Sequence, residues 1–290
     1  GPITLTADND GASAGSITMD SGSTVESQGG LVQLSAYDDI AVSAITSNGG
    51  RVELTSTNGN IIDNDSTPAK NVTANELVIN TANSVGQLAD AIDTEISLLS
   101  ATISGIGSLF IDNTIAVELL DVSTFDGNIT LNSTGTITAT SVVSTNNSAS
   151  DDNDITLTAI GSSSDILVTT ITATGNADVT LTADDGILDT NGADTNRITA
   201  DNLMLTSSSA GGTQDGIDVD TAVNSVTADV NTNAGGIRLD EVDAIILTQV
   251  TTVDGFITVN AGGTIQVLDV NSANSSASDT NNGITLTATG

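Results

Sequence analysis

Clusters of aspartate and asparagine are the residues in this sequence whose types and spacing could support chemistry. They lie in short polar segments between apolar runs, such as Asp63–Asp65 (DND) and Asp151–Asp154 (DDND). Calcium binds six to eight oxygen atoms from carboxylates, carbonyls and asparagine side chains, so turns of this kind could bind it where they stack on one another. The candidate calcium ligands are Asp8, Asp10, Asp63, Asp65, Asp151, Asp152, Asp154, Asp184, Asp185, Asp218 and Asp220.

Two observations favour a simpler role for these clusters. The strict calcium-loop pattern D-x-[DN]-x-[DN]-G-x5-E is absent from the sequence, and so is the glycine-rich nonapeptide of calcium β-rolls. Aspartate and asparagine also cap turns by hydrogen bonding to nearby backbone groups. We therefore expect turn capping and no cofactor, with calcium binding as the alternative.

Paired carboxylates can also hydrolyse glycosides, a reaction that some β-helical proteins perform. Enzymes that cleave acidic polysaccharides usually add a cationic residue beside the carboxylates, whereas Arg51, Arg197 and Arg238 are far apart in this sequence. Each aspartate-rich segment also has the composition of a turn. The sequence therefore predicts a protein without enzymatic activity and without catalytic residues.

The charge balance excludes several classes of partner. The 290 residues include 37 acidic and 4 basic ones, a formal net charge of −33, and no cysteine, histidine or tryptophan. The chain thus lacks the usual ligands of zinc, haem and iron–sulfur clusters and the usual nucleophile–base pairs. Nucleic acid binding needs clustered cations, and a membrane span needs about 18 consecutive apolar residues. We expect neither nucleic acid as a partner nor membrane insertion.

An internal repeat reveals the elements that carry these turns. The segment 39–42 (DIAV) recurs as 165–168 (DILV), and the segment 126–132 (DGNITLN) recurs as 254–260 (DGFITVN). The offset between the two occurrences is nearly the same in both cases, although the segments lie far apart in the chain. An offset that drifts this slowly means that one long unit is present twice, with small changes in its loops.

The repeat defines the predicted domain organisation. We expect one continuous domain over residues 1–290, with copy 1 at about 39–164, copy 2 at about 165–290 and an extra coil at 1–38. Arg197 of copy 2 aligns within one residue of Lys70 of copy 1, which favours an ion pair between Arg197 and a neighbouring carboxylate. Exposed pairs of this kind contribute little to stability.

A finer period within each copy indicates the fold. Segments such as Ile155–Thr158 and Ile284–Thr287 alternate apolar and polar residues, which predicts half-buried β-strands. Alternate members of this series of segments repeat with a period of about 20 residues, as from Ile237 to Ile257. Short strands in a repeat of about 20 residues predict an all-β parallel solenoid of about a dozen coils stacked at ~4.8 Å.

Two further features agree with a narrow solenoid. Only Tyr37, Phe110, Phe125 and Phe256 are aromatic, and small β-branched side chains fill a narrow interior better than rings do. The segment Ser84–Leu99 has apolar residues at helical spacing, but its counterpart in copy 2 has three glycines and no such stripe. We therefore expect a loop followed by a strand there rather than a helix.

The repeats resemble those of filamentous haemagglutinin-like large bacterial exoproteins. The likeness rests on an Ala/Gly-x-Asp-x-Asp-Thr type of segment followed by Gly-Gly-Ile and Asp-Gly-x-Ile-Thr types of segment. The residues that carry it are Ala89–Thr94, Gly105–Ile111 and Gly127–Leu131 in copy 1 and Gly216–Thr221, Gly235–Ile237 and Gly255–Val259 in copy 2. The resemblance covers essentially the whole chain, and it specifies architecture better than activity.

The resemblance implies a right-handed parallel β-helix at the bacterial cell surface. Proteins of that family form extracellular shafts that mediate adhesion or the cohesion of a biofilm matrix. The implied partners are neighbouring repeats of the same protein and a host-surface or polysaccharide receptor that the sequence does not name. Two alternatives stay open, a self-assembling extracellular filament or sheath subunit and a calcium- or carbohydrate-binding module.

Overall fold

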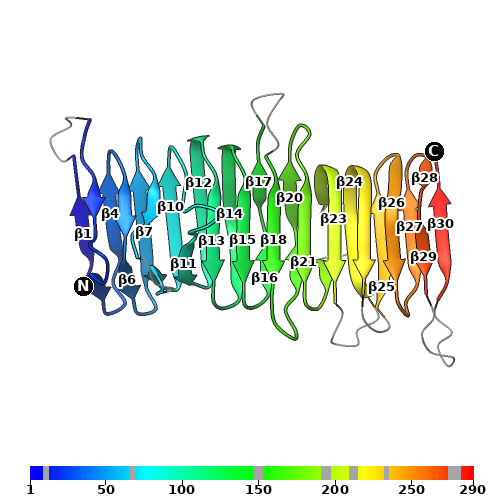
Figure 1. Cartoon of the computed structure of the whole chain (residues 1–290), viewed down its shortest axis with the longest axis horizontal. Coiled ribbons are helices and arrows are strands. Elements are labelled where there is room, and N and C mark those ends of the chain that lie inside the picture. Colours follow the sequence, from blue (N-terminus) through cyan, green and yellow to red (C-terminus); the bar gives the residue numbers. More distant parts are fainter. Residues whose placement is uncertain are drawn as a thin grey trace.

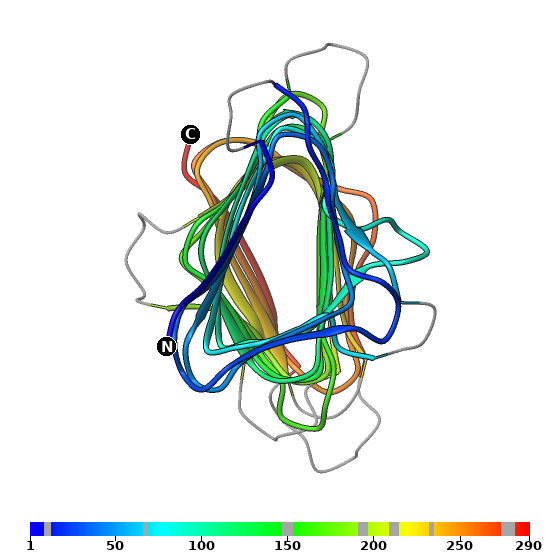
Figure 2. The same cartoon turned by 90° about the vertical axis from the view of Figure 1, so that its left-hand side faces the viewer.

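The chain folds into a rod of stacked parallel β-strands. The computed structural model describes residues 1–8, 13–65, 69–146, 153–190, 197–208, 215–231, 235–273 and 282–290, and these ranges contain strands and turns but no helix. Coils follow one another along the long axis, and the two termini lie at opposite ends (Figure 1). Down the axis, the coils superimpose into one closed outline (Figure 2). The predicted all-β solenoid is confirmed.

Each turn of the solenoid contributes strands to two faces. Face A contains β1 (Ile3–Thr6), β4 (Val32–Ala36), β7 (Arg51–Ser56), β10 (Glu76–Thr81), β12 (Leu98–Ile106), β14 (Val117–Asp126), β16 (Ile137–Ala139), β17 (Val142–Ser144), β19 (Ile166–Val168), β20 (Thr170–Ala173), β22 (Ile187–Asp189), β25 (Gly236–Glu241), β27 (Ile257–Ala261) and β30 (Ile284–Ala288).

The remaining strands form face B or connect the two faces. Face B contains β2 (Ile17–Thr18), β3 (Thr24–Ser27), β5 (Ile40–Val42), β6 (Ala44–Ser47), β8 (Ile61–Asp63), β9 (Val72–Thr73), β11 (Ile92–Glu95), β13 (Leu109–Asn113), β15 (Ile129–Ser133), β18 (Ile155–Ala159), β21 (Val179–Ala183), β26 (Ile245–Thr252), β28 (Ile265–Val267) and β29 (Val270–Ser272). The long strands β23 (Arg197–Ser207) and β24 (Asp215–Val230) begin on face A and end on face B.

Register along face A is continuous from one end of the rod to the other. In-register neighbours on successive turns are Ile3, Val32, Val52, Leu77, Leu99, Leu119, Ala139, Val168 and Asp189, and the ladder continues from Ile187 of the same strand through Ile217, Ile237, Ile257 and Ile284. The ladder therefore has twelve register steps. At ~4.8 Å a step the rod is about 58 Å long.

The interior is a column of aliphatic side chains. Alternate strand residues point inward and are buried, as in the pattern of β15, β18 and β21. The buried hydrophobic residues are Val, Ile, Leu, Ala and one Met, and none of the four aromatic residues is among them. Phe125 is 44% exposed, and Tyr37, Phe110 and Phe256 are half-buried. The narrow aliphatic interior predicted from the composition is therefore confirmed.

The segment with helical spacing is not a helix. Residues 84–91 form a loop with isolated bridges, in which Val85 pairs with Ile61 and with Leu109. Strand β11 follows directly, and Ile92 within it and Ile96 just after it are buried. The expected loop and strand are confirmed: Val85 and Ile92 stack on neighbouring turns instead of lining one helical stripe, and Leu88 is exposed.

The two sequence copies lie on different faces. From Ile40 on face B, register passes through Ile61, Val85, Leu109 and Ile129 to Ile155, which is five full turns. The next strand, β19, contains Ile166, the sequence counterpart of Ile40, and lies on face A. Copy 2 therefore begins five and a half turns after copy 1.

The same exchange of faces holds along the whole repeat. Val52 lies on face A, whereas its counterpart Val179 lies on face B. Ile129 lies on face B, and its counterpart Ile257 lies on face A. Equivalent residues of the two copies thus face opposite sides of the rod.

Candidate functional site

A ladder of turn side chains runs along the start of the face B strands. In each of seven successive steps a side-chain oxygen accepts a hydrogen bond from the backbone N–H of the equivalent residue one turn later, at 2.7–3.2 Å. The ladder residues in order are Asp39, Asn60, Ser84, Ser108, Asn128, Asp154, Asp178 and Asn202. Turn capping by aspartate and asparagine, which the sequence favoured, is therefore present, and it joins each turn to the next.

Asp63 and Asp65 are the candidate ligands that the structure brings together. The Asp65 N–H donates to Asp63 Oδ1 at 2.7 Å, and Asn71 Nδ2 donates to the same oxygen at 2.6 Å. The Asp65 carboxylate accepts hydrogen bonds from Ser21 at 2.8 Å and from Ser43 at 3.0 Å. Protein donors therefore occupy most of the oxygens that a cation would use.

The other candidates serve separate turns. Asp154 belongs to the ladder, and Asp184 Oδ2 accepts from the Gly161 N–H at 2.7 Å. The backbone of Asp185 donates to the Ser164 carbonyl at 3.1 Å, and Asp8 adopts a positive φ of 74°. Asp10, Asp151 and Asp152 lie outside the described residues. These positions are spread along the rod and do not form one cluster.

Asp218 and Asp220 lie on β24 and pair with the next face A strand. Asp218 is in register with Arg238, whose Nη1 lies 3.2 Å from Asp218 Oδ2. Asp220 is in register with Asp240, which accepts a hydrogen bond from Asn260 Nδ2 at 2.7 Å. Asp220 and Asp240 line a cavity of about 320 Å³ that also includes Arg197 and Glu241.

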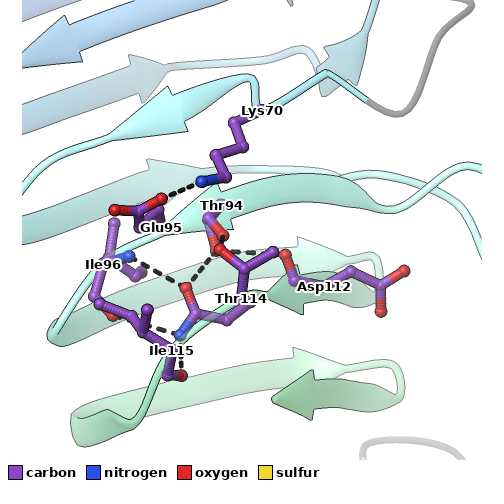
Figure 3. Close-up of polar contacts among 8 residues, drawn as sticks. Lys70, Thr94, Glu95, Ile96, Asp112, Thr114 and Ile115 are labelled. Carbon is purple, nitrogen blue, oxygen red and sulfur yellow. Dashed lines mark hydrogen bonds and ion pairs between the residues drawn. The ribbon is translucent and has the colours of Figure 1, made fainter. Parts of the chain in front are cut away.

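Asn113 forms a buried polar corner in copy 1, at the end of β13. Its Oδ1 accepts hydrogen bonds from Thr94 Oγ1 at 2.9 Å and from the Ile96 N–H at 3.0 Å. Its Nδ2 donates to the carbonyls of Ile115 at 2.6 Å and Ile96 at 3.2 Å (Figure 3). Both ends of the amide are satisfied, so Asn113 is 3% exposed without a lost hydrogen bond. The Lys70–Glu95 ion pair lies on the outer side of the same corner.

Glu241 occupies the same corner in copy 2. It is the repeat counterpart of Asn113, lies at the end of β25 and is 5% exposed. Its Oε2 accepts from Thr221 Oγ1 at 2.8 Å and from the Val223 N–H at 3.1 Å, as Asn113 accepts from the counterparts of these residues. Its Oε1 accepts from the Asp243 N–H at 3.2 Å.

The carboxylate makes the copy 2 corner electrostatically different. Burial raises the pKa of Glu241 above its ordinary value of 4.5. Hydrogen bonds from Thr221, Asp243 and Val223 oppose this increase, and the charge of Asp243 adds to it. Sequence reasoning missed this residue because a single glutamate at a strand end does not stand out. The alignment of Glu241 with Asn113 in the internal sequence repeat was the available signal.

A second cleft lies in copy 1, beside the exposed turn Gln87–Asp90. It has a volume of about 360 Å³, and its carboxylates are those of Asp63 and Asp90. Burial raises the pKa of Asp63 above its ordinary 3.8, and the negative charges of Asp90 and Asp65 raise it further. Burial and then the charges of Asp112, Asp63 and Asp90 raise the pKa of Asp93. These carboxylates repel one another, and sequence reasoning did not anticipate their proximity.

No group of three or more acidic side chains is arranged to hold a metal ion within the described parts of the chain. Calcium binding therefore stays a prediction that no observed geometry supports. The described residues also contain no helix long and apolar enough to cross a membrane. Comparison with protein-family models, curated proteins and solved structures finds no match to this chain.

Proposed function

We propose that this chain is a structural and adhesive shaft segment of a large secreted bacterial surface protein, similar in role to filamentous haemagglutinin-like exoproteins. The observation that carries the proposal is the unbroken register from β1 to β30, because each turn is stabilised mainly by its two neighbours. Added turns therefore lengthen an element of this kind without changing its cross-section. The chain would extend from the cell and hold an adhesive region at a distance.

The exchange of faces between the copies supports a role in cohesion. Whatever surface copy 1 presents on face B, copy 2 presents its counterpart on face A, as with Ile129 and Ile257. A shaft built in this way offers related surfaces to neighbours on both sides. The acidic surface also suits an extracellular role, since a net charge of −33 keeps single rods apart until a specific contact forms.

Electron microscopy of a lengthened chain tests the shaft. A second copy of residues 165–290 would be appended to the full chain, and the original chain would be the control. Five and a half turns at ~4.8 Å predict an increase of about 26 Å in length at constant width. A wider particle, or one of unchanged length, would contradict an extendable shaft.

Bead assays test the adhesive part of the proposal separately. Beads coated with the chain would be mixed with bacterial biofilm matrix and with one another, and beads coated with an acidic globular protein of similar net charge would be the control. The proposal predicts attachment or clumping above the control. Equal attachment of both kinds of bead would remove adhesion and leave only the spacer role.

A further inference from the structure

The cleft of copy 1 is built by a hydrogen-bonded turn with exposed residues, Gln87–Asp90. Gln87 and Asp90 exchange two backbone hydrogen bonds at 2.9 and 3.0 Å, which close the turn. Gly86 precedes it at a φ of 63°, and a Cβ there would lie 2.7 Å from the Phe110 carbonyl oxygen. Glycine is needed at such a position, so the turn is fixed over strand β8. Leu88 lies in this turn and is 79% exposed.

The cleft combines apolar walls with two carboxylates and has no cation to pair with them among its described lining residues. Leu88, Ile62 and the half-buried Phe110 supply the apolar surface, and Asp63 and Asp90 supply the carboxylates. None of the described residues that line the cleft is basic. Burial and then neighbouring carboxylates raise the pKa values of Asp63 and Asp93, and no cation is among the groups that act on them. A cationic guest would relieve this repulsion.

Copy 2 has a basic residue where copy 1 has Phe110. Arg238 is the counterpart of Phe110, since Phe110 is in register with Thr130 and Arg238 with the equivalent Thr258. The Arg238 guanidinium forms an ion pair with Asp218 at 3.2 Å and lies 5.7 Å from the centre of the Phe256 ring. On face A, the chain therefore already holds a guanidinium of its own with a carboxylate and an aromatic ring.

We propose that the cleft lined by Asp63, Asp90, Leu88 and Phe110 binds an arginine or lysine side chain of a partner polypeptide. The cationic head would pair with the Asp90 carboxylate and with Asp63 Oδ2, because Asp63 Oδ1 already accepts hydrogen bonds from the Asp65 N–H and Asn71 Nδ2. The aliphatic stem would lie against Leu88 and Phe110. The Phe110 ring adds a cation–π contribution of the kind that Arg238 and Phe256 form in copy 2. The partner is a basic peptide segment, which suits a rod with few basic residues of its own.

The test uses the full chain and a defined probe. The probe is a fluorescein-labelled heptapeptide with two arginines in a glycine–serine background, and its fluorescence anisotropy is measured in 0.15 M salt. We expect saturable binding with a dissociation constant on the order of 100 μM. The same peptide with citrulline in place of arginine keeps the shape and lacks the charge, and it should not bind.

Two variants and a matched control separate the cleft from general attraction to an acidic protein. The double variant Asp63→Asn/Asp90→Asn should weaken binding about tenfold. Leu88→Ser changes an exposed residue without changing charge, so it leaves the fold intact and should weaken binding about threefold. The control Asp20→Asn/Asp121→Asn removes two charges from exposed positions elsewhere and should change binding less than twofold.

Three results would overturn the proposal. The first is the absence of saturable binding by the original chain. The second is an equal loss of affinity in the control and in the cleft double variant, which would indicate a non-specific attraction to net charge. The third is unchanged binding in Leu88→Ser together with unchanged binding in the cleft double variant. Circular dichroism of each variant confirms that the β-structure is retained.

Discussion

The polar corners of the two copies show how one buried position accommodates two chemistries. Asn113 on face B and Glu241 on face A accept hydrogen bonds from equivalent donors. One donor is a threonine hydroxyl of the preceding turn, and the other is the backbone N–H two residues after that threonine. Asn113 is neutral and also donates to two carbonyls, whereas the Glu241 carboxylate accepts only and is charged when it is ionised. The scaffold therefore specifies an acceptor at this corner, and the rest of the side chain can change between copies.

The largest effect is expected where the two copies are alike. Gly127 and Gly255 are counterparts, and a Cβ on either would overlap the carbonyl oxygen of the glycine one turn earlier, Gly107 or Gly235. Gly127→Ala and Gly255→Ala must therefore shift backbone, at a cost of about 3 kcal/mol each in the free energy of unfolding. Urea denaturation of both variants measures this. A large loss in one copy and none in the other would contradict the structural equivalence of the copies.

Asn113→Asp should have the next largest effect, because it breaks the neutral corner of copy 1. The Ile96 carbonyl would lose its side-chain donor, the Ile115 carbonyl would keep only Ser133 Oγ, and both would face a buried carboxylate, which should cost about 2 kcal/mol at pH 7. The loss should shrink at acidic pH, where the new carboxyl is protonated. The control is Asn80→Asp, at an exposed position of β10 where the in-register neighbours are Thr55 and Thr102. If both variants unfold at the same urea concentration, burial of the new carboxylate is not the cause of the lost stability.

A pair of threonine variants compares the two acceptors directly. Thr221 donates to a carboxylate at 2.8 Å, and Thr94 donates to an amide oxygen at 2.9 Å. Hydrogen bonds to charged groups are about twice as strong as neutral ones, so Thr221→Val should cost about 2 kcal/mol and Thr94→Val about 1 kcal/mol. Thermal denaturation at pH 7 gives the order. The reverse order would mean that Glu241 is uncharged at that pH.

The smallest effect is the pH dependence that Glu241 contributes in copy 2. Because the pKa of Glu241 is raised in the folded state, its contribution to stability is fully present below the ordinary value of 4.5 and is lost as pH rises through the folded pKa. The Tm of the original chain should therefore rise as pH is lowered from 7 towards 4.5, and Glu241→Gln should reduce that rise. The charged groups around Glu241 are Asp243 and the cavity residues Arg197, Asp220 and Asp240.

The comparison with Glu241→Gln isolates this residue from the general effect of acid. Protonation of the many exposed carboxylates also relieves repulsion in a chain of net charge −33, and Asp63, Asp93 and Asp165 have raised pKa values as well. These contributions are common to both proteins, so they cancel in the difference. Identical pH profiles for the original chain and Glu241→Gln would show that Glu241 does not titrate differently in the folded state.

The sequence predicted the solenoid because period-two alternation and a spacing of about 20 residues are properties of every turn. The aliphatic interior followed for the same reason, since a column repeated at each turn must suit small side chains. The placement of the copies on opposite faces could not be predicted. It depends on the number of residues in each turn, which varies with the loops: the turn from Val32 to Val52 is shorter than the turn from Ile187 to Ile217. Only the strand register shows which face the chain has reached after several turns.

The candidate carboxylates were predicted less well. The expectation that aspartates cap turns holds for Asp154 and Asp184, yet Asp63, Asp65 and Glu241 are buried. Burial of these three depends on donors that are distant in sequence, such as Ser21 for Asp65 and Thr221 for Glu241. A local pattern does not contain that information.

Distances between spin labels test the central claim, that equivalent residues of the two copies lie on opposite faces of one rod. The chain has no cysteine, so pairs of cysteines can be introduced and labelled specifically. Thr130 and Gln249 share a face B column five turns apart, whereas Thr130 and its repeat counterpart Thr258 are on different faces. Pulsed electron paramagnetic resonance should give about 24 Å for Thr130→Cys/Gln249→Cys and at least about 28 Å for Thr130→Cys/Thr258→Cys, because five and a half turns along the rod combine with about 10 Å between the faces and the labels point apart. Equal distances for the two pairs would place both copies on the same face and contradict the account.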